Sequence, residues 1–343
     1  MRILHLLASP FFSGPAELVA RLAEAQRSLG HEVKVAVDRK RAGGAAEEPA
    51  APVFSSMGLL DDGLELSVHS TPPAVLRDVR ALAARRVDVV HAHFSHDHLL
   101  ARFGCPRTAA LVRSVHAPRS LRWSLPRADA FTVPARALVR KIPNRPVMVL
   151  PALVGPEFRP PEDRRALRAK LGLDGSPLIG MVSTFQPSRR HSLGVSALRL
   201  LLQRRPEARL ILLGDGALEP RVREQVAEER VADHVAFLGY RSGAEYVQYL
   251  QALDEVWILG LGNDWSGRAA AQARACGVRV VAVDEGGLGA YADAVAAPTP
   301  EAVANASGSG RREDKALPDV QEIAGAVCDL YERCRRAGGG ERR

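Results

Sequence analysis

The chain has 343 residues, of which 46% are hydrophobic and 25% charged. This is an ordinary globular composition, and it excludes intrinsic disorder and collagen-like repeats. Four scattered cysteines, with no CxxC pair, exclude a disulfide framework and give no zinc-binding signature. At about 100–200 residues per domain, the length predicts two domains.

The net charge of +8 is placed unevenly along the chain. Residues 1–150 carry 21 Lys and Arg against 13 Asp and Glu, whereas residues 151–343 carry 26 of each sign. The excess is either a solvated, arginine-rich surface or a face for an anionic partner, such as a phospholipid surface, a lipid-linked phosphate or a nucleic acid. Because aromatic residues make up 5% and show no stacking pattern, nucleic acid is the weakest of the three and is not expected as a partner.

No apolar run reaches the roughly 18–20 residues that a membrane span needs. We therefore expect a cytoplasmic protein, and the basic half leaves peripheral contact with the inner face of the cytoplasmic membrane open.

Short apolar strands alternate with amphipathic helices through the first half. Strands are predicted at 3–7, 31–37, 87–92, 109–115, 130–133 and 147–150, helices at 16–29, 73–85 and 135–141, and a mobile loop at 39–51. Such alternation implies right-handed crossovers and a parallel sheet with helices on both faces.

Prolines at 151, 156, 160 and 161 mark a linker, after which the alternation starts again. Helices are predicted at 164–171, 194–204, 220–231, 244–250, 267–276 and 319–334, strands at 178–183, 209–213, 235–238, 255–259 and 279–283, and disorder from 337 onward. The chain is thus an α/β protein of two Rossmann-like, doubly wound domains that face a cleft. The domains are predicted at 1–155 and 165–318, and a terminal helix at 319–336 packs back towards the first. Ligands of such sheets bind at the carboxyl ends of the strands.

The loop from Ser183 to His191 places Arg189 and Arg190 at the start of a helix. Cations are unfavourable there, because the N-terminal end of a helix carries positive partial charge. A bound anion such as a diphosphate would relieve the conflict, with the guanidinium groups on its oxygens. The alternative is a solvated pair.

A second loop, Asn263-Asp-Trp-Ser-Gly-Arg268, opens the helix predicted at 267–276. Asp264 is placed to accept hydrogen bonds from sugar hydroxyls. Ser266 is predicted as the N-cap and Gly267 as the first helical residue, whose N–H faces a phosphate, and Arg268 adds a guanidinium. Simple capping is the alternative reading of Ser266.

Several glycines lie in turns that follow strands. Gly14 stands between the first strand and helix, Gly214 lies in Leu213-Gly-Asp-Gly-Ala217, and two more lie in Asp284-Glu-Gly-Gly287. Glycine permits close approach of a ligand, although for Gly14 a tight turn is the simpler reading. None of these segments is GxGxxG, so a dinucleotide site is not predicted.

Four histidines and an aspartate cluster in Val90-His-Ala-His-Phe-Ser-His-Asp-His98. Their spacing is not that of a hydrolytic zinc site, and we expect no metal site. His116 stands at the carboxyl end of the strand predicted at 109–115. We expect it to make a hydrogen-bonding or electrostatic contact with a reacting sugar.

The sequence resembles the GT-B glycosyltransferases, specifically the retaining GT4 family, over about residues 1–335. The segments that carry the resemblance are Leu29-Gly-His-Glu-Val33, Asp88-Val-Val-His-Ala-His93, Ser114-Val-His116, Pro156-Glu-Phe-Arg-Pro160, Leu212-Leu-Gly-Asp-Gly216, Phe237-Leu-Gly239 and Ala275-Cys-Gly-Val-Arg-Val-Val-Ala282. The last is close to the family's ACGxPVVA segment and is the most specific match.

The resemblance implies that the N-terminal domain binds the acceptor and the C-terminal domain the nucleotide sugar. It also implies metal-independent transfer with retained anomeric configuration, no cofactor beyond a UDP- or GDP-linked donor, and a cell-envelope glycan or lipid-linked acceptor such as lipopolysaccharide or exopolysaccharide. His116 matches the family's histidine near the donor sugar, and Gly14 its phosphate-approaching glycine.

The sequence departs from the family at its charged positions. The paired acids of the Glu-x7-Glu motif fall on Asp264 and Gln272, and the phosphate-binding Arg and Lys fall on Thr184 and Arg189, so that Arg268 is the candidate substitute for the missing cation. An amide still hydrogen-bonds to a ribose, without charge assistance.

These departures keep two alternatives open. One is a non-catalytic nucleotide-sugar-binding homologue that acts as a partner protein. The other is a nucleotide-sugar epimerase of the same fold. It is less favoured because the sequence shows no second general-base residue as an obvious partner of His116.

Overall fold

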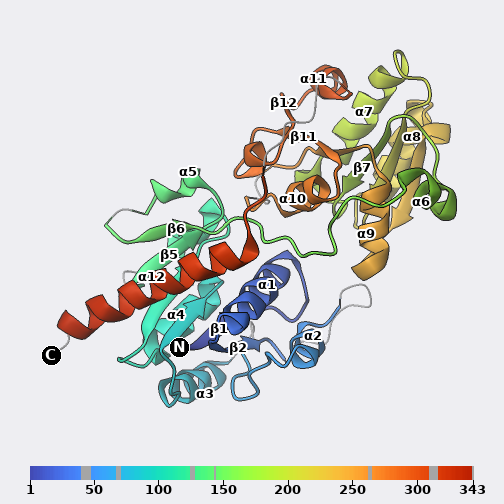
Figure 1. Cartoon of the computed structure of the whole chain (residues 1–343). Coiled ribbons are helices and arrows are strands. Elements are labelled where there is room, and N and C mark those ends of the chain that lie inside the picture. Colours follow the sequence, from blue (N-terminus) through green and yellow to red (C-terminus); the bar gives the residue numbers. More distant parts are fainter. Residues whose placement is uncertain are drawn as a thin grey trace. The chain divides into compact units, whose positions relative to one another are not determined.

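The computed structural model describes residues 1–39, 48–66, 71–123, 128–142, 144–261, 265–308 and 316–341. The chain divides into two compact units, Met1–Leu153 with Pro318–Arg343, and Val154–Leu317. Figure 1 traces both along the sequence. They are named unit 1 and unit 2 below.

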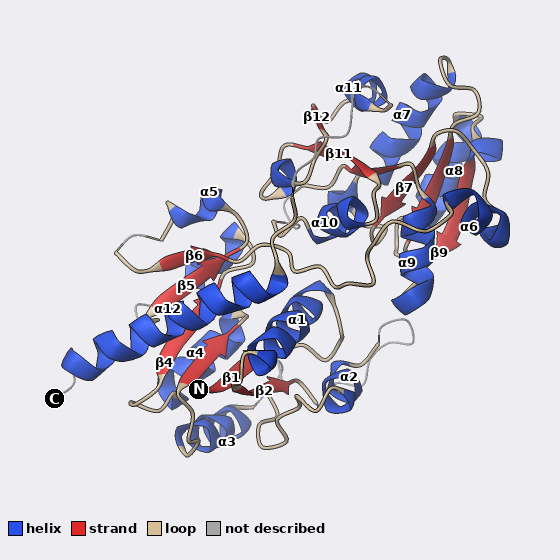
Figure 2. Ribbon diagram, in the orientation of Figure 1, coloured by secondary structure: helices blue, strands red, loops and turns tan. Residues whose placement is uncertain are grey.

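Unit 1 is built on a six-stranded sheet in the order β2-β1-β3-β4-β5-β6, with every pair parallel (Figure 2). The strands are β1 Arg2–Leu7, β2 Glu32–Val37, β3 Val89–Ala92, β4 Ala110–Ser114, β5 Ala130–Val133 and β6 Val147–Val149. Their apolar runs are buried on both faces, as expected for a parallel sheet covered by helices.

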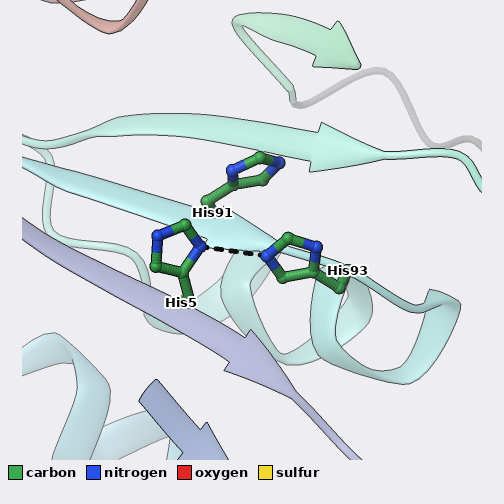
Figure 3. Close-up of side chains that lie close together, drawn as sticks. All are labelled: His5, His91 and His93. Carbon is green, nitrogen blue, oxygen red and sulfur yellow. Dashed lines mark hydrogen bonds between the residues drawn. The ribbon is translucent and has the colours of Figure 1, made fainter. Parts of the chain in front are cut away.

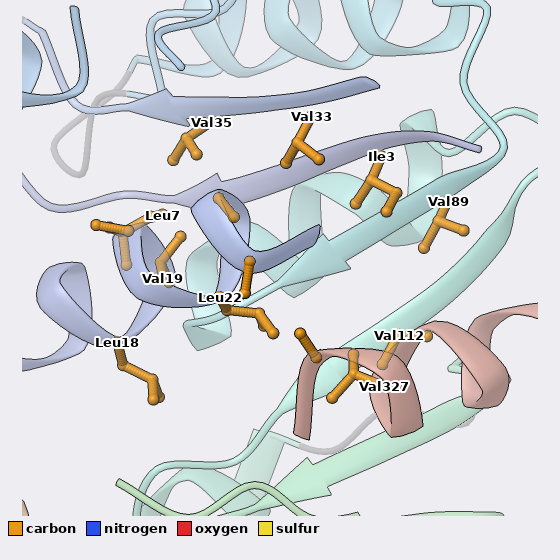
Figure 4. Close-up of a cluster of buried hydrophobic side chains, with 14 of the residues drawn as sticks. Ile3, Leu7, Leu18, Val19, Leu22, Val33, Val35, Val89, Val112 and Val327 are labelled. Atoms are coloured by element: carbon orange, nitrogen blue, oxygen red, sulfur yellow. The ribbon is translucent and has the colours of Figure 1, made fainter. Parts of the chain in front are cut away.

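Alternate strand residues of unit 1 face two separate cores. Ile3 and Val89 pack with α1 and α12 on one face (Figure 4), whereas Leu4 and Val90 pack with α3 and α4 on the other. The helices are α1 Gly14–Ser28, α2 Ala50–Ser56, α3 Pro72–Ala83, α4 Ser95–Gly104, α5 Arg136–Val139 and α12 Val320–Glu341. The last helix of the chain therefore completes the core of unit 1.

Unit 2 repeats the architecture with a sheet in the order β12-β11-β10-β7-β8-β9, again with parallel pairs. The strands are β7 Leu178–Val182, β8 Arg209–Leu213, β9 Val235–Gly239, β10 Glu255–Ile258, β11 Arg279–Val283 and β12 Ala294–Ala296. The helices are α6 Arg164–Leu171, α7 His191–Leu202, α8 Glu219–Glu228, α9 Gly243–Ala252, α10 Arg268–Ala275 and α11 Pro300–Ala306. The prediction of two doubly wound parallel sheets is confirmed.

The structure corrects two expectations about irregular segments. The loop predicted at 39–51 lies partly outside the described residues, and its end is the first turn of α2, whose Phe54 is buried against Phe12. Helix propensity did not predict α2, because Pro52 and two serines are poor helix formers. The tail predicted as disordered from 337 is helical to Glu341. Its glycines are poor helix formers, but they continue α12, whose earlier turns are held by packing in the core of unit 1.

Within the described ranges, no helix is both long and apolar enough to cross a membrane.

Candidate functional site

The loops that follow β7 and β10 meet at one edge of the unit 2 sheet. These two strands are neighbours, and the strand order reverses between them, which is where ligands bind in open α/β sheets. The backbone N–H of Leu261 donates to the carbonyl of Ser188 at 2.8 Å. A Cβ on Gly260 would lie 3.0 Å from that carbonyl oxygen and 3.4 Å from the Cδ of Arg189.

Two arginines in the loop after β7 hold buried polar atoms with no partner among the described residues. They are the Nε of Arg189 and an η-nitrogen of Arg190. Arg190 is the N-cap of α7 and has a left-handed backbone (φ +56°). An unsatisfied buried donor costs about 1–3 kcal/mol, more when it is charged, so this edge favours an anionic acceptor.

His191 follows these arginines at the start of α7. Its Nε2 lies 3.3 Å from the Ser183 hydroxyl, and its ring stacks on Phe185. Burial, together with the weaker effect of the Arg189 charge, lowers the pKa of His191 to about 4, although a hydrogen bond to the backbone of Ser183 raises it. At neutral pH the imidazole is therefore uncharged, and the positive charge of this loop comes from the arginines.

Gly214 and Thr184 are close together, for a reason that the sequence did not reveal. A Cβ on Gly214 (φ +147°) would lie 2.1 Å from the carbonyl oxygen of Ser183 and 3.4 Å from the backbone nitrogen of Thr184. Gly216 is constrained in the same way by the backbone of Phe185. These glycines let the loop after β8 approach the loop after β7, and a ligand is not needed to explain them.

We therefore expect Gly214→Ala to lower the free energy of unfolding of unit 2 by more than about 1 kcal/mol, because both the backbone angle and the space exclude a Cβ. Gly289→Ala is the matched control, since a Cβ there meets nothing within 4 Å. Urea unfolding of the two variants checks this, and an unchanged midpoint for Gly214→Ala would contradict it.

The start of α10 differs from the prediction. The N-cap is Gly267 (φ +65°) and not Ser266, and the helix begins at Arg268. A Cβ on Gly267 would lie 2.8 Å from the ring of Tyr291, so a left-handed glycine is required at this turn. Gly286 is similarly close to Trp265, so that this glycine too is explained by packing of the chain on itself.

Arg268 and Gln272 lie one turn apart on α10 and contact each other. The side-chain oxygen of Gln272 accepts from an η-nitrogen of Arg268 at 3.4 Å and from the hydroxyl of Tyr246 at 2.8 Å. Gln272 is fully buried. The structure thus joins Arg268 to Gln272, whereas Arg189 lies against Gly260. Asp264 lies outside the described residues.

In unit 1 the strand order reverses between β1 and β3, and Asp97 holds together the loops that follow them. Its two carboxylate oxygens accept from the backbone N–H of Ala8 at 3.0 Å and of Phe94 at 2.9 Å. Burial raises the pKa of Asp97 to about 7, against the backbone donors, which lower it. Since each carboxylate oxygen accepts a backbone hydrogen bond, we interpret Asp97 as a structural residue that joins the two loops. Gly14 lies at the same edge as the first residue of α1, which begins two residues earlier than predicted.

His116 lies two residues beyond the end of β4, at the carboxyl edge of the unit 1 sheet. Burial lowers its pKa to about 4, although a hydrogen bond to the backbone of His93 raises it. Its Nε2 is buried without a partner among the described residues. This edge therefore presents an uncharged imidazole with one unused nitrogen.

Three buried histidines of unit 1, namely His5, His91 and His93, lie close together (Figure 3). One nitrogen each from His5, His91 and His93 lie within 4.8 Å of one another, which is close enough to hold a metal ion. His5 was missed as a candidate, although it interrupts an apolar strand. The parallel register places it directly beside His91. His96 and His98 lie instead on α4, where the Nδ1 of His98 is 3.3 Å from an η-nitrogen of Arg113.

Two family models match the chain, one in each half. The model described as "Glycosyl transferases group 1" matches residues 163–295, and that described as "Glycosyltransferase Family 4" matches residues 12–152. Together they account for most of the chain.

Curated relatives carry related names. The chain is 36% identical over 161 residues to a D-inositol 3-phosphate glycosyltransferase of Stackebrandtia nassauensis, covering 44% of this chain and 36% of that protein. It is 31% identical over 135 residues to a GDP-mannose-dependent monoacylated alpha-(1-6)-phosphatidylinositol monomannoside mannosyltransferase of Corynebacterium glutamicum, covering 37% and 35%. The matches thus span about a third of the length of these relatives.

Solved structures share the fold over nearly the whole chain. Anabaena HepE in complex with UDP and glucose superposes with a TM-score of 0.73 at 18% identity, covering 99% of this chain and 100% of that one. Sucrose-phosphate synthase of Thermosynechococcus elongatus gives 0.73 at 17% identity, covering 98% and 100%. With matches of both halves to the family models and this fold, the chain belongs to the GT4-like group 1 glycosyltransferases of the GT-B fold.

Proposed function

We propose that this protein is a retaining glycosyltransferase that moves a hexosyl group from a nucleotide diphosphate sugar, UDP- or GDP-linked, to a cell-envelope glycan or lipid-linked acceptor. Unit 2 binds the donor in this proposal, and unit 1 binds the acceptor. The observation that carries it is a pair of buried guanidinium nitrogens, of Arg189 and Arg190, that have no partner among the described residues and lie at the reversal point of the unit 2 sheet.

The proposed chemistry follows from the charge of the leaving group. Breaking the bond between sugar and diphosphate adds negative charge to the diphosphate, and donors already fixed beside it stabilise the transition state more than the ground state. Arg189 supplies a guanidinium there, and Arg268 with the first-turn N–H groups of α10 is the proposed second contact. Thr184 and Gly214 lie in the neighbouring loops after β7 and β8 and are also assigned to donor binding. Gln272 is assigned to the ribose and Asp264 to the sugar. No metal is needed where arginines take this role.

Unit 1 carries the acceptor side of the proposal, and two of its residues are assigned to the donor. His116 is assigned to the transferred sugar and Gly14 to phosphate. The names of the two relatives refer to inositol phosphate and to a phosphatidylinositol mannoside, the first an anionic polyol and the second a lipid that carries one. The excess of 21 cationic over 13 anionic side chains in residues 1–150 suits such acceptors and peripheral contact with the inner face of the membrane.

A non-catalytic nucleotide-sugar-binding homologue is the second candidate. It is favoured by Gln272, which stands where the resemblance implies an acid and is fully buried in bonds to Tyr246 and Arg268. A partner protein would keep donor binding without turnover.

The two candidates are separated by incubating the full chain with UDP- and GDP-hexoses, with and without myo-inositol phosphates or phosphatidylinositol vesicles. For the transferase we expect release of nucleoside diphosphate that depends on the acceptor, with the anomeric configuration retained in the product. Calorimetric donor binding with no release of diphosphate under any acceptor would overturn it and support the partner protein.

A further inference from the structure

Tyr246 connects helices α9 and α10 through a buried side chain. Its hydroxyl donates to the side-chain oxygen of Gln272 at 2.8 Å, and Gln272 is fully buried. The ring of Tyr246 packs in a T-shaped arrangement against the buried ring of Phe158, with centroids 6.0 Å apart. Because packing holds the ring and a hydrogen bond holds the hydroxyl, Tyr246 fixes the position of the Gln272 oxygen.

The same oxygen of Gln272 accepts a second hydrogen bond, from an η-nitrogen of Arg268 at 3.4 Å. Arg268 is the first residue of α10, one turn before Gln272, and it is half-buried. A long arginine side chain loses rotamer freedom when a ligand fixes it. A contact that restrains the guanidinium beforehand reduces this cost, and an anion then binds there more tightly.

The amide of Gln272 restrains Arg268 without adding a negative charge. A glutamate at position 272 would have nearly the same shape, but its carboxylate would form an ion pair with Arg268 at i, i+4 spacing and offset part of the positive charge. An amide oxygen accepts the same N–H and is neutral. The contact with Gln272 therefore orders the guanidinium and does not weaken its attraction for an anion.

We propose that Tyr246 and Gln272 are positioning residues that hold Arg268 in place for the diphosphate of the nucleotide donor. Arg268 opens α10, whose first-turn N–H groups also favour an anion. The inference deepens the proposed function, on which it rests for the identity of the ligand. Gln272 acts here through Arg268, in addition to the ribose contact assigned to it above.

The first arm of the test observes Arg268 in the full chain without ligand. Rotation about the Cζ–Nε bond exchanges the two η-nitrogens of an arginine, and a hydrogen bond to one of them slows this rotation. With ¹⁵N-arginine labelling we expect two separate Nη resonances for Arg268, assigned by their absence in Arg268→Lys. Tyr246→Phe keeps the ring and removes the hydroxyl, and the two resonances should then merge.

The matched control is Tyr249→Phe, which removes a hydroxyl from the same helix. The Tyr249 ring lies 5.8 Å from the guanidinium of Arg241, a contact that phenylalanine keeps. The Arg268 resonances should stay separate in this variant. Identical Arg268 resonances in the wild type and in Tyr246→Phe would overturn the proposal.

The second arm measures the binding of UDP and GDP by titration calorimetry. For the nucleotide that binds, we expect the affinity to fall about fivefold in Tyr246→Phe and at least tenfold in Gln272→Glu, and to stay within twofold in Tyr249→Phe. Circular dichroism checks the folding of Gln272→Glu, which buries a carboxylate. If that variant unfolds, Tyr246→Phe alone decides, and an unchanged affinity in it would overturn the proposal.

A double-mutant cycle shows whether Tyr246 acts through Arg268. In an Arg268→Met background, the further change Tyr246→Phe should alter the affinity less than twofold, because the guanidinium that it positions is gone. A merely structural role of Tyr246, or an effect through the ribose alone, would give the same fivefold loss in both backgrounds. That result would overturn the proposal.

The outcome for sugar transfer is separate. The expected affinities without transfer to any acceptor would overturn the transferase and leave this inference intact. Transfer with equal affinities in the wild type and Tyr246→Phe would overturn this inference alone. Binding of neither UDP nor GDP by the wild type would overturn both.

Discussion

Arg189→Ala is expected to lower kcat for sugar transfer by about 100- to 1,000-fold, the usual loss on removing one fixed donor from a developing anion. Its Nε is buried without a partner in the described part of the chain, and its side chain lies against Gly260 where two loops meet. The donor KM should change much less than kcat, because the diphosphate gains charge as the bond to the sugar breaks. Steady-state kinetics with the UDP- or GDP-hexose that supports transfer in the incubation above measure both constants.

Two further variants make this result specific. Arg189→Lys keeps the charge but not the planar guanidinium, so it should recover only part of the rate. Arg199→Ala removes an arginine from α7, the helix that follows the Arg189 loop, on its exposed side where Arg199 pairs with Glu229, and should leave kcat unchanged. A fall in kcat of less than threefold for Arg189→Ala would show that Arg189 does not stabilise the transition state.

Regular elements could be predicted from the sequence where local signals act alone. The bounds of α6 were right because Asp163 caps its start through the N–H of Ala166, and Gly172 ends it with φ +65°. Strands β8 and β11 were right because both are short apolar runs between turns. Helix α2 was missed because its stability comes from burying Phe54, a contact that propensity does not contain.

The candidate sites were predictable in part, for a related reason. Loops after parallel strands share one edge, which indicated Arg189, Arg268 and His116 from the order of elements alone. The Tyr246–Gln272 contact joins residues 26 positions apart on two helices, and no local pattern reports it. The role of Gly214 could not be predicted from the sequence. A glycine required by close packing of the protein's own backbone and a glycine required by a bound ligand give the same sequence signal, and only the structure distinguishes them.

Acidification from pH 7 to pH 5 is expected to destabilise unit 1 strongly, because its histidines are neutral in the folded state. Burial lowers the pKa of His5, His98 and His116 to about 4, and that of His91 and His93 well below 6.5. The unfolded chain binds protons below pH 6.5 and the folded chain does not until about pH 4, so the free energy of unfolding falls between these values. Each fully buried histidine contributes about 1.4 kcal/mol per pH unit within that window.

Asp97 acts in the opposite direction, which allows a sharp test. Burial raises its pKa from 3.8 to about 7, so the folded state takes up this proton first and gains stability as the pH falls through 7. Urea unfolding followed by circular dichroism at several pH values should therefore show a shallower pH dependence for His98→Leu and a steeper one for Asp97→Asn than for the wild type. Equal slopes for all three proteins, or a wild type as stable at pH 5 as at pH 7, would show that these histidines are already charged in the folded state.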